Sequence, residues 1–212
     1  MRRWLLLLGA LALAPAAGLA APDALDDLLG RFRAMPGLEA DFREEKRFAL
    51  LDAPLVSRGT LHFQPPGRLA RHVTAPAPST VLLDGDRLAL GDEHGRTELD
   101  LARRPAVRLF VDAFVKVLAG DRPALERIFH LAHAHTPADD DGWTLVLRPR
   151  VSPLKEAIER LELQGRGLVL ARMRLVEVGG DETLTTFSRV DVERRYGPDE
   201  AARVFRLPAG ER

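Results

Sequence analysis

The sequence predicts a mainly β protein of the α+β class, an antiparallel sheet of about ten strands with a few apolar helices against it. One observation is a series of short runs in which apolar and polar residues alternate. Turn residues separate these runs at intervals of about ten to twelve positions. The other is that the helical segments do not alternate with the strands, so they cannot be βαβ crossovers.

A first helix is predicted over residues 24–35. Its apolar residues recur at helical spacing and form one stripe, made of Leu25, Leu28, Leu29 and Phe32. Asp23 is a suitable N-cap, and Pro36 followed by Gly37 ends the helix. Residues 38–50 then alternate between apolar and charged side chains, which predicts a long strand with one apolar face that charges interrupt.

Residues 57–88 predict a meander of three short strands. Pro65-Pro66 lies in the first turn, and the proline-bearing residues 75–78 make a stiff connection to the third strand. Asp84-Gly85 stands between two apolar runs, which is a strong hairpin signal. Further strands are predicted at 96–101, 130–135, 143–148, 157–163, 168–178 and 183–192, with a short terminal strand at 204–208.

The most apolar helix of the mature chain is predicted over residues 105–118, beginning at Pro105 and stopping before Gly120. Asp121 can cap a second, shorter helix over residues 122–128. A helix this apolar must cover an apolar surface. The two helices either fill the concave side of the sheet as an ordinary core or act as a plug over a cavity.

The N-terminus has the pattern of a secretory signal peptide. Arg2 and Arg3 precede a short apolar stretch, residues 4–13, and small residues follow up to a cleavage position after Ala20. We therefore expect residues 1–20 to be removed and residues 21–212 to form a single domain in the periplasm. No other stretch is long and apolar enough to predict a membrane-spanning helix of the ~30 Å that a bilayer requires.

Composition narrows the classes of function. The chain has no cysteine, which excludes thiol catalysis, disulfides and lipid attachment at a cysteine. After loss of Arg2 and Arg3, 29 basic residues stand against 31 acidic ones, a formal charge of −2. A nucleic-acid partner would demand a basic face, so none is expected. The sequence also lacks the nucleophile-elbow, zincin, phosphate-loop and dinucleotide motifs, so we do not expect an enzyme or a cofactor.

Two groups of polar residues are candidate sites. The first combines histidines with an acidic run, His130, His133, His135, Asp139, Asp140 and Asp141. Two of these histidines share a strand face, but a solvated loop explains the acidic run equally, and we expect no metal. The second is Arg71, which shares a strand face with Leu69 and Val73. It either points toward the concave side of the sheet or lies along an edge with its stem buried.

The chain resembles the LolA family of periplasmic outer-membrane lipoprotein carriers. The resemblance runs from about Ala24 to Leu207 and is most specific in a G-x-L-x-F, P-x-R-L and DG-x-x-L pattern. The matching residues are Gly59, Leu61, Phe63, Pro66, Arg68, Leu69, Asp84, Gly85 and Leu88. The resemblance implies a half-open antiparallel β-barrel with an apolar cavity under a helical lid. It also implies a monomer that takes acylated cargo from an inner-membrane ABC exporter and gives it to an outer-membrane receptor.

On this basis a set of residues is expected to line the cavity and the lid. They are Leu61, Phe63, Leu69, Arg71, Leu82, Leu88, Phe110, Phe114, Leu145, Leu147 and Met173. Each apolar member could equally be an ordinary core residue, and only the structure of the concave side distinguishes the two.

Two departures from the family pattern leave the cargo open. Family carriers often place an arginine directly before the turn proline, where this chain has Pro65, and the usual F-x-Q is here Phe42-Arg43-Glu44. A LolA-like carrier of another amphiphile, such as a glycolipid or polyene lipid, is therefore an alternative to a lipoprotein carrier. A periplasmic sensor module on the same fold is a second alternative.

Overall fold

The computed structural model describes residues 23–50, 52–103, 105–135 and 141–206. These residues contain eleven strands, where about ten were predicted. They are β1 (Leu38–Arg47), β2 (Leu55–Gln64), β3 (Arg68–Ala75), β4 (Ser79–Asp84), β5 (Arg87–Asp92), β6 (Gly95–Asp100), β7 (Phe129–His135), β8 (Gly142–Pro149), β9 (Ile158–Arg166), β10 (Val169–Glu177) and β11 (Glu182–Asp191).

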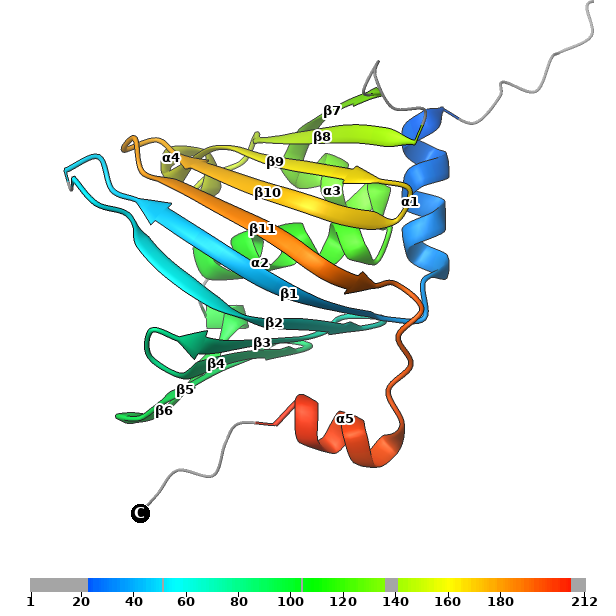
Figure 1. The fold of residues 1–212 in the computed structure, drawn as a ribbon. Helices are drawn as coiled ribbons and strands as arrows, with labels where there is room; N and C mark the ends of the chain where they lie inside the picture. The colour runs from blue at the N-terminus through cyan, green and yellow to red at the C-terminus, as the bar shows by residue number, and fades with distance from the viewer. Residues whose placement is uncertain (1–22, 51, 104, 136–140, 207–212) are drawn as a thin grey trace, which may run out of the picture.

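The strands form one antiparallel sheet in the order β6-β5-β4-β3-β2-β1-β11-β10-β9-β8-β7. Consecutive strands are neighbours in the sheet, except for β6 and β7, and the first and last strands, β1 and β11, pair in the middle. Strands β6 and β7 are left as two edges that do not pair with each other within the described residues. The sheet curls strongly without closing (Figure 1), as in a half-barrel.

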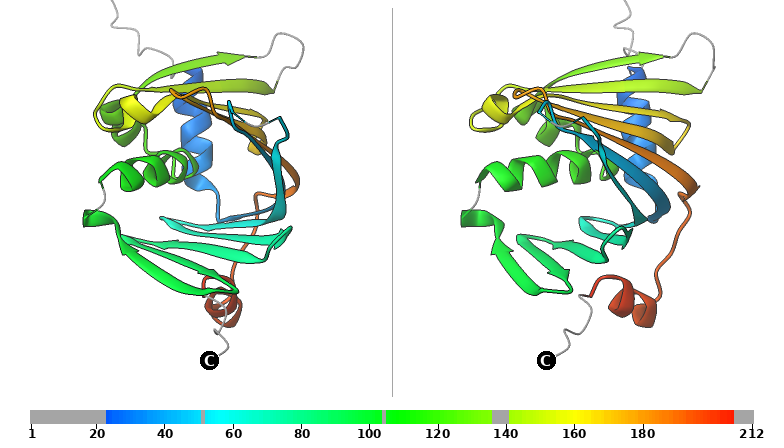
Figure 2. Two further views of the ribbon diagram at one scale, coloured as in Figure 1. Left: turned by 90° about the vertical axis from the view of Figure 1, so that its left-hand side faces the viewer. Right: turned by 60° about the vertical axis from the view of Figure 1, so that its left-hand side comes forward.

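Five α-helices accompany the sheet in the described residues. They are α1 (Ala24–Ala34), α2 (Pro105–Leu118), α3 (Arg122–Ile128), α4 (Leu154–Ala157) and α5 (Pro198–Val204). Helix α2 lies inside the curve of the sheet, and α1 lies across one end of it (Figure 2). The predicted fold, a mainly β half-open barrel with helical elements, is confirmed.

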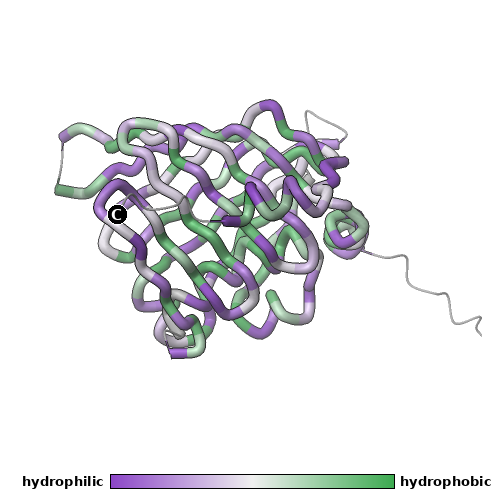
Figure 3. Tube along the Cα trace, turned by 90° about the horizontal axis from the view of Figure 1, so that it is seen from below, coloured by the Kyte–Doolittle hydropathy of each residue, from purple (hydrophilic) through white to green (hydrophobic). Residues whose placement is uncertain are grey.

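Alternating burial explains why the sheet has one packed face. Along β1, Leu38, Ala40 and Phe42 are buried, whereas Glu39, Asp41 and Arg43 between them are partly or fully exposed. Successive side chains of a strand point to opposite faces, so this alternation turns one face toward the helices. The same alternation of apolar and polar positions is visible along much of the trace in Figure 3.

The predicted helix caps are present. The Asp23 carboxylate accepts a hydrogen bond from the Asp26 backbone N–H at 2.9 Å, and Asp121 does the same for Ala124 at 3.1 Å. Gly120 ends the α2 turn with a φ of +62°. A Cβ added there would lie 2.0 Å from the Leu29 carbonyl oxygen, so glycine permits both the left-handed turn and the close approach of α1.

The C-terminal segment differs from the prediction. A strand was expected over residues 204–208, but Val204 is the last residue of α5, and residues beyond 206 lie outside the described part of the chain. Pro198 at the first helical position, followed by Asp199 and Glu200 in the first turn, favours a helix start. The short apolar run at 204–208 therefore follows a helix and does not begin a strand.

Helix α5 packs on the outer face of the meander. The His72 Nε2–H donates to the Val204 carbonyl at 2.9 Å, and the Tyr196 hydroxyl donates to the Leu38 carbonyl at 2.8 Å. The Tyr196 oxygen also lies 3.1 Å from His62 Nδ1. Burial beneath this segment lowers the pKa of His62 and favours its neutral form.

None of the described helices combines the length and the apolar character that crossing a bilayer requires. The predicted signal peptide, residues 1–20, lies outside the described residues.

Candidate functional site

The concave face of the sheet is the candidate site, because α2 covers it and most of the predicted lining residues face it. Much of this face is a continuous apolar core. Its fully buried members include Phe63 of β2, Leu145 and Leu147 of β8, and Leu163 of β9, each with 0% exposure. In this part of the face the expected lining residues are core residues, packed against the helices.

Helix α2 contributes a second kind of surface to the concave side. Ala113, Val117 and Leu118 are buried against the core, whereas Leu109 and Phe114 are only partly buried at its margin. Met173 and Val81, on the facing sheet, are also partly buried apolar residues packed against the same cluster. The packing between α2 and this part of the sheet is therefore less complete than in the core behind it.

The two ends of α2 are tied to different elements. At its C-terminal end, Arg33 Nη2 of α1 donates to the Gly120 carbonyl at 2.6 Å. Toward its N-terminal end, the Arg108 guanidinium lies 2.8 Å from an Asp86 carboxylate oxygen in the turn between β4 and β5. Helix α2 thus spans the concave side between α1 and the meander.

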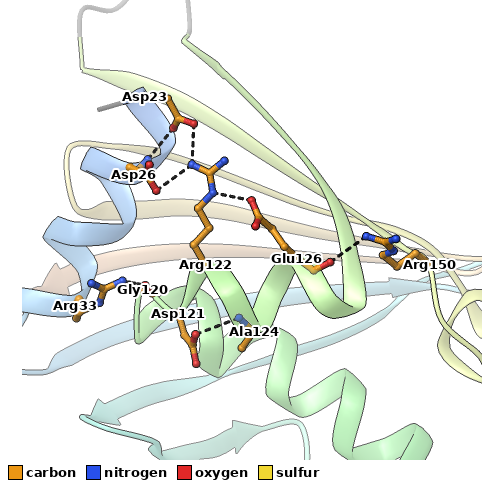
Figure 4. A network of polar contacts seen from close by, with 9 residues as sticks. All are labelled: Asp23, Asp26, Arg33, Gly120, Asp121, Arg122, Ala124, Glu126 and Arg150. Atoms are coloured by element: carbon orange, nitrogen blue, oxygen red, sulfur yellow. Dashed lines mark hydrogen bonds and ion pairs between the residues drawn. The ribbon is translucent and has the colours of Figure 1, made fainter. Parts of the chain in front are cut away.

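Helix α3, which follows the C-terminal end of α2, is also bonded to α1, as Figure 4 shows. The Arg122 guanidinium lies 2.7 Å from Asp23 and 2.9 Å from Asp26, both at the start of α1, and 2.7 Å from Glu126 of its own helix. These bonds hold the pKa of Asp23 below its usual range. The end of α2 next to α3 is therefore attached by several bonds, and the Arg108–Asp86 pair holds the other end to the meander.

The concave face also carries charge, at the end of β1 away from α1. Glu44 accepts a hydrogen bond from Arg71 Nη2 at 2.8 Å, and its other oxygen lies 3.3 Å from the Thr185 hydroxyl. The Ser57 hydroxyl lies 3.4 Å from Glu44 and 3.3 Å from Arg71. We call these four residues the polar quartet. They come from β1, β2, β3 and β11, which are adjacent strands.

Strand register places the quartet on the inner face. Glu44 lies directly opposite Ser57 on β2 and Thr185 on β11, and Thr185 is in turn opposite Met173. Directly opposed residues share a face. The Arg71 guanidinium lies over the ring of Phe42, 4.4 Å from its centroid, which directs it along the sheet toward Glu44. Of the two positions considered for Arg71, the structure shows the one that faces the concave side.

Lys46 and Glu177 form a second ion pair near the quartet, with Nζ and Oε1 3.2 Å apart. Lys46 follows Glu44 on the same face of β1 and lies opposite Thr183 of β11. The side chains of Glu44 and Arg71 are 25% and 26% exposed, and those of Lys46 and Glu177 are 35% and 32% exposed. This part of the face is therefore polar and still reached by solvent.

The structure brings most of the predicted site residues together. Those buried in the main core are Leu61, Phe63, Leu69, Leu88, Leu145 and Leu147. Phe114 and Met173 lie at its margin, and Arg71 lies in the polar quartet. The backbone of Phe110 belongs to α2, but its side chain lies outside the described residues.

Leu82 lies elsewhere. It pairs with Ala70 of β3 and packs on the outer face in a small cluster with Val204 and Phe205. Leu83, the next residue, is the one that faces the core. Glu44 is the member of the candidate site that was not among the predicted lining residues. The sequence marked it in two ways, as a charge that interrupts the apolar alternation of β1 and as the departure from the F-x-Q pattern.

Of the group of histidines and acidic residues only a part is described, and the described residues contain no cluster of three or more potential metal ligands. Both His130 and His133 belong to β7. His130 is exposed, whereas His133 is partly buried. Asp139 and Asp140 lie outside the described residues.

Comparison with known proteins identifies relatives at the level of a family and of a fold. The family model described as outer membrane lipoprotein carrier protein LolA-like matches residues 16–193. No curated protein sequence matches the chain significantly.

Three solved structures are similar to this chain to different degrees. The crystal structure of MucB aligns with a TM-score of 0.50 at 14% identity, over 88% of this chain and 62% of that one. This chain therefore spans about three fifths of MucB. A LolA superfamily protein from Nitrosomonas europaea gives 0.42 at 12% identity, over 84% and 96%. Lipoprotein LppX from Mycobacterium tuberculosis gives 0.39 at 11% identity, over 81% and 100%.

Proposed function

This chain belongs to the LolA-like family of outer membrane lipoprotein carrier proteins, and on that premise we propose that its concave face binds the acyl chains of a lipid or lipoprotein beneath α2. The carried molecule would travel in the periplasm, from the inner to the outer membrane. An exporter in the first membrane and a receptor in the second are the partners that this transport needs.

The physical requirement for a carrier is shielding of the acyl chain from water. Each buried methylene contributes about 0.8 kcal/mol, so a chain of ~16 carbons gains roughly 12 kcal/mol by leaving water. Release must also be possible, so the protein must bind the chain by non-directional contacts and not hold it much more tightly than the next binding partner does. A sheet face rich in leucine, valine and phenylalanine meets both needs.

The observation that carries the proposal is the incomplete burial of apolar side chains between α2 and the sheet. Leu109 and Phe114 of α2, and Met173 and Val81 of the sheet, are partly buried at the margin of the main core. In the proposed mechanism α2 rests on the sheet when the protein is empty and moves away when an acyl chain enters. The chain then takes over the apolar contacts that α2 made.

The cargo has two candidates. A lipoprotein is the cargo after which the family is described. Another amphiphile is favoured by two residues of this chain, Pro65 before the turn proline and Glu44 in place of the glutamine of the F-x-Q pattern. Both changes fall within or beside the strands that form the concave face.

The direct test is mass spectrometry of lipids that co-purify with the mature protein from the periplasm, together with displacement of a fluorescent acyl probe. We expect bound acyl lipid, and we expect Phe114→Asp to abolish probe binding while circular dichroism still reports a folded sheet. The matched control is Leu50→Asp, the same kind of change at a residue that is 96% exposed. Unchanged probe binding by the Phe114 variant would reject the role of α2.

A further inference from the structure

The polar quartet is an unusual feature on the packed face of a half-barrel. The Glu44 carboxylate and the Arg71 guanidinium are about three quarters buried, with their closest atoms 2.8 Å apart. Removing such a pair from water costs free energy that its mutual attraction only roughly repays, so it is a poor source of stability. Apolar side chains at both positions would continue the core, so the pair calls for an explanation other than folding.

We propose that the polar quartet binds the headgroup of a zwitterionic glycerophospholipid, with the phosphate at Arg71 and the ammonium at Glu44. The inference rests on the proposed function, because the acyl chains of the same lipid would lie beneath α2. It selects between the two cargo classes in favour of a lipid whose headgroup carries one negative and one positive charge.

Charge complementarity favours this headgroup. The quartet contains one cation and one anion, so its net charge is zero, and the neighbouring Lys46–Glu177 pair is likewise neutral. A zwitterion can replace each partner of the Glu44–Arg71 pair with an opposite charge of its own. A purely anionic headgroup would satisfy Arg71 but would leave the Glu44 carboxylate next to a second negative charge in a partly buried site.

The hydrogen-bonding capacity of the quartet agrees with this assignment. Arg71 makes its bonds to Glu44 and Ser57 through Nη2. Its Nη1 and Nε have no partner among the residues that the structure describes, so the guanidinium retains donors for phosphate oxygens. The hydroxyls of Ser57 and Thr185, which already contact the pair, can bond to either half of the headgroup.

The position of the quartet allows one lipid to occupy both sites. Thr185 lies opposite Met173, which is one of the partly buried apolar residues packed against the main core. Arg71 lies opposite Val81, another of them. The polar and the apolar surfaces are therefore adjacent on the same sheet face, in the arrangement that the head and the tails of an amphiphile require.

The test uses the mature protein mixed with vesicles that contain phosphatidylethanolamine, phosphatidylglycerol and diacylglycerol with identical acyl chains. The protein is separated from the vesicles, and its bound lipid is quantified by mass spectrometry. We expect phosphatidylethanolamine to be enriched over phosphatidylglycerol by roughly 1.4- to 5-fold relative to the vesicles, the range expected for a partly exposed charge pair.

Two variants of the quartet should change this ratio in a defined way. Glu44→Gln removes the anion and should shift the preference toward phosphatidylglycerol, at least to equality. Arg71→Gln should weaken binding of both phospholipids. Glu45→Gln is the matched control, because Glu45 is the next residue of β1, points to the outer face and pairs with Arg43 there. It should leave the ratio unchanged.

Diacylglycerol separates the two proposals, because it has the same chains and no charged headgroup. If the protein binds diacylglycerol but takes up the two phospholipids in the vesicle proportion, or if Glu44→Gln keeps the parent ratio, the headgroup inference is wrong and acyl binding stands. If none of the three lipids binds to the folded protein, the proposed function itself is wrong. Circular dichroism and thermal unfolding of each variant establish that it is folded.

Discussion

The two halves of the β1–β2 hairpin differ sharply, although the same two strands build both. In the half next to α1, the opposed pair of Leu38 and Phe63 is 1% and 0% exposed. In the half away from α1, the opposed pair of Glu44 and Ser57 is partly exposed and hydrogen-bonded. We call these the packed half and the polar half.

The difference shows that strand alternation fixes which face a residue points to, but not what that face is used for. Both halves turn the same set of alternate residues toward the concave side. The packed half lies at the end of the half-barrel that α1 crosses (Figure 1), and its inner residues are core. The polar half lies at the other end, where the inner residues are polar and partly exposed.

The largest effect should come from the packed half. Phe63→Ala removes a fully buried ring and should lower the free energy of unfolding by about 3–5 kcal/mol, through lost burial and the cavity left behind. The control is Leu55→Ala on the same strand, where a side chain 60% exposed should cost under ~0.5 kcal/mol. Urea unfolding of both proteins gives the comparison. Similar losses in the two variants would mean that the halves are packed alike.

A smaller effect is expected in the polar half, where the loss should depend on which partner remains. Arg71→Met alone leaves the Glu44 carboxylate without its cation and should cost about 1–3 kcal/mol. Adding Glu44→Leu removes the stranded charge, so the double variant should return to within ~1 kcal/mol of the parent protein. Thermal and urea unfolding of the parent, the two single variants and the double variant measure this coupling. A double variant as unstable as the sum of the single ones would show that the pair serves folding.

The smallest effect on stability should come from loss of the ion pair between α2 and the meander. Arg108 and Asp86 are 39% and 62% exposed, so Arg108→Gln should change the free energy of unfolding by less than ~1 kcal/mol. Amide hydrogen exchange in α2 should nevertheless become faster, because the helix loses an attachment at that end. Arg103→Gln, which affects a pair with Asp100 outside α2, is the control. Equal exchange rates in both variants would argue against an α2 end that moves.

The sequence predicted the strands of the half-barrel and the first three helices well, because alternating and helical periods are local properties. Leu82 shows where this fails. Val81, Leu82 and Leu83 are consecutive apolar residues, so the sequence pattern does not indicate which of them face the core. The register Leu69–Leu83 and Ala70–Leu82, set by the neighbouring strand, turns Leu82 outward, where α5 covers it.

The candidate site was predictable only in part, for the same reason. The sequence showed that Arg71 shares a strand face with Leu69 and Val73, but it left open whether the side chain points toward the concave side or lies along an edge. Its partner Glu44 is 27 positions away and comes within 2.8 Å only because β2 lies between β1 and β3. Glu44 could be recognised in the sequence as a charge on an apolar strand face, but its partner could not.

The segment that ends in α5 supports one side of the half-barrel from outside. Tyr196 is bonded to the backbone of β1, and α5 is bonded to β3 through His72, so both contacts back the wall of the barrel from outside. Between this backing and the core within, β2, β3 and β4 are held from both sides. The movement proposed for α2, which lies inside the curve of the sheet, would then be the way in which the internal volume increases. On that proposal the outer wall of the half-barrel stays in place, and the distance that α2 moves limits how much cargo the protein can hold.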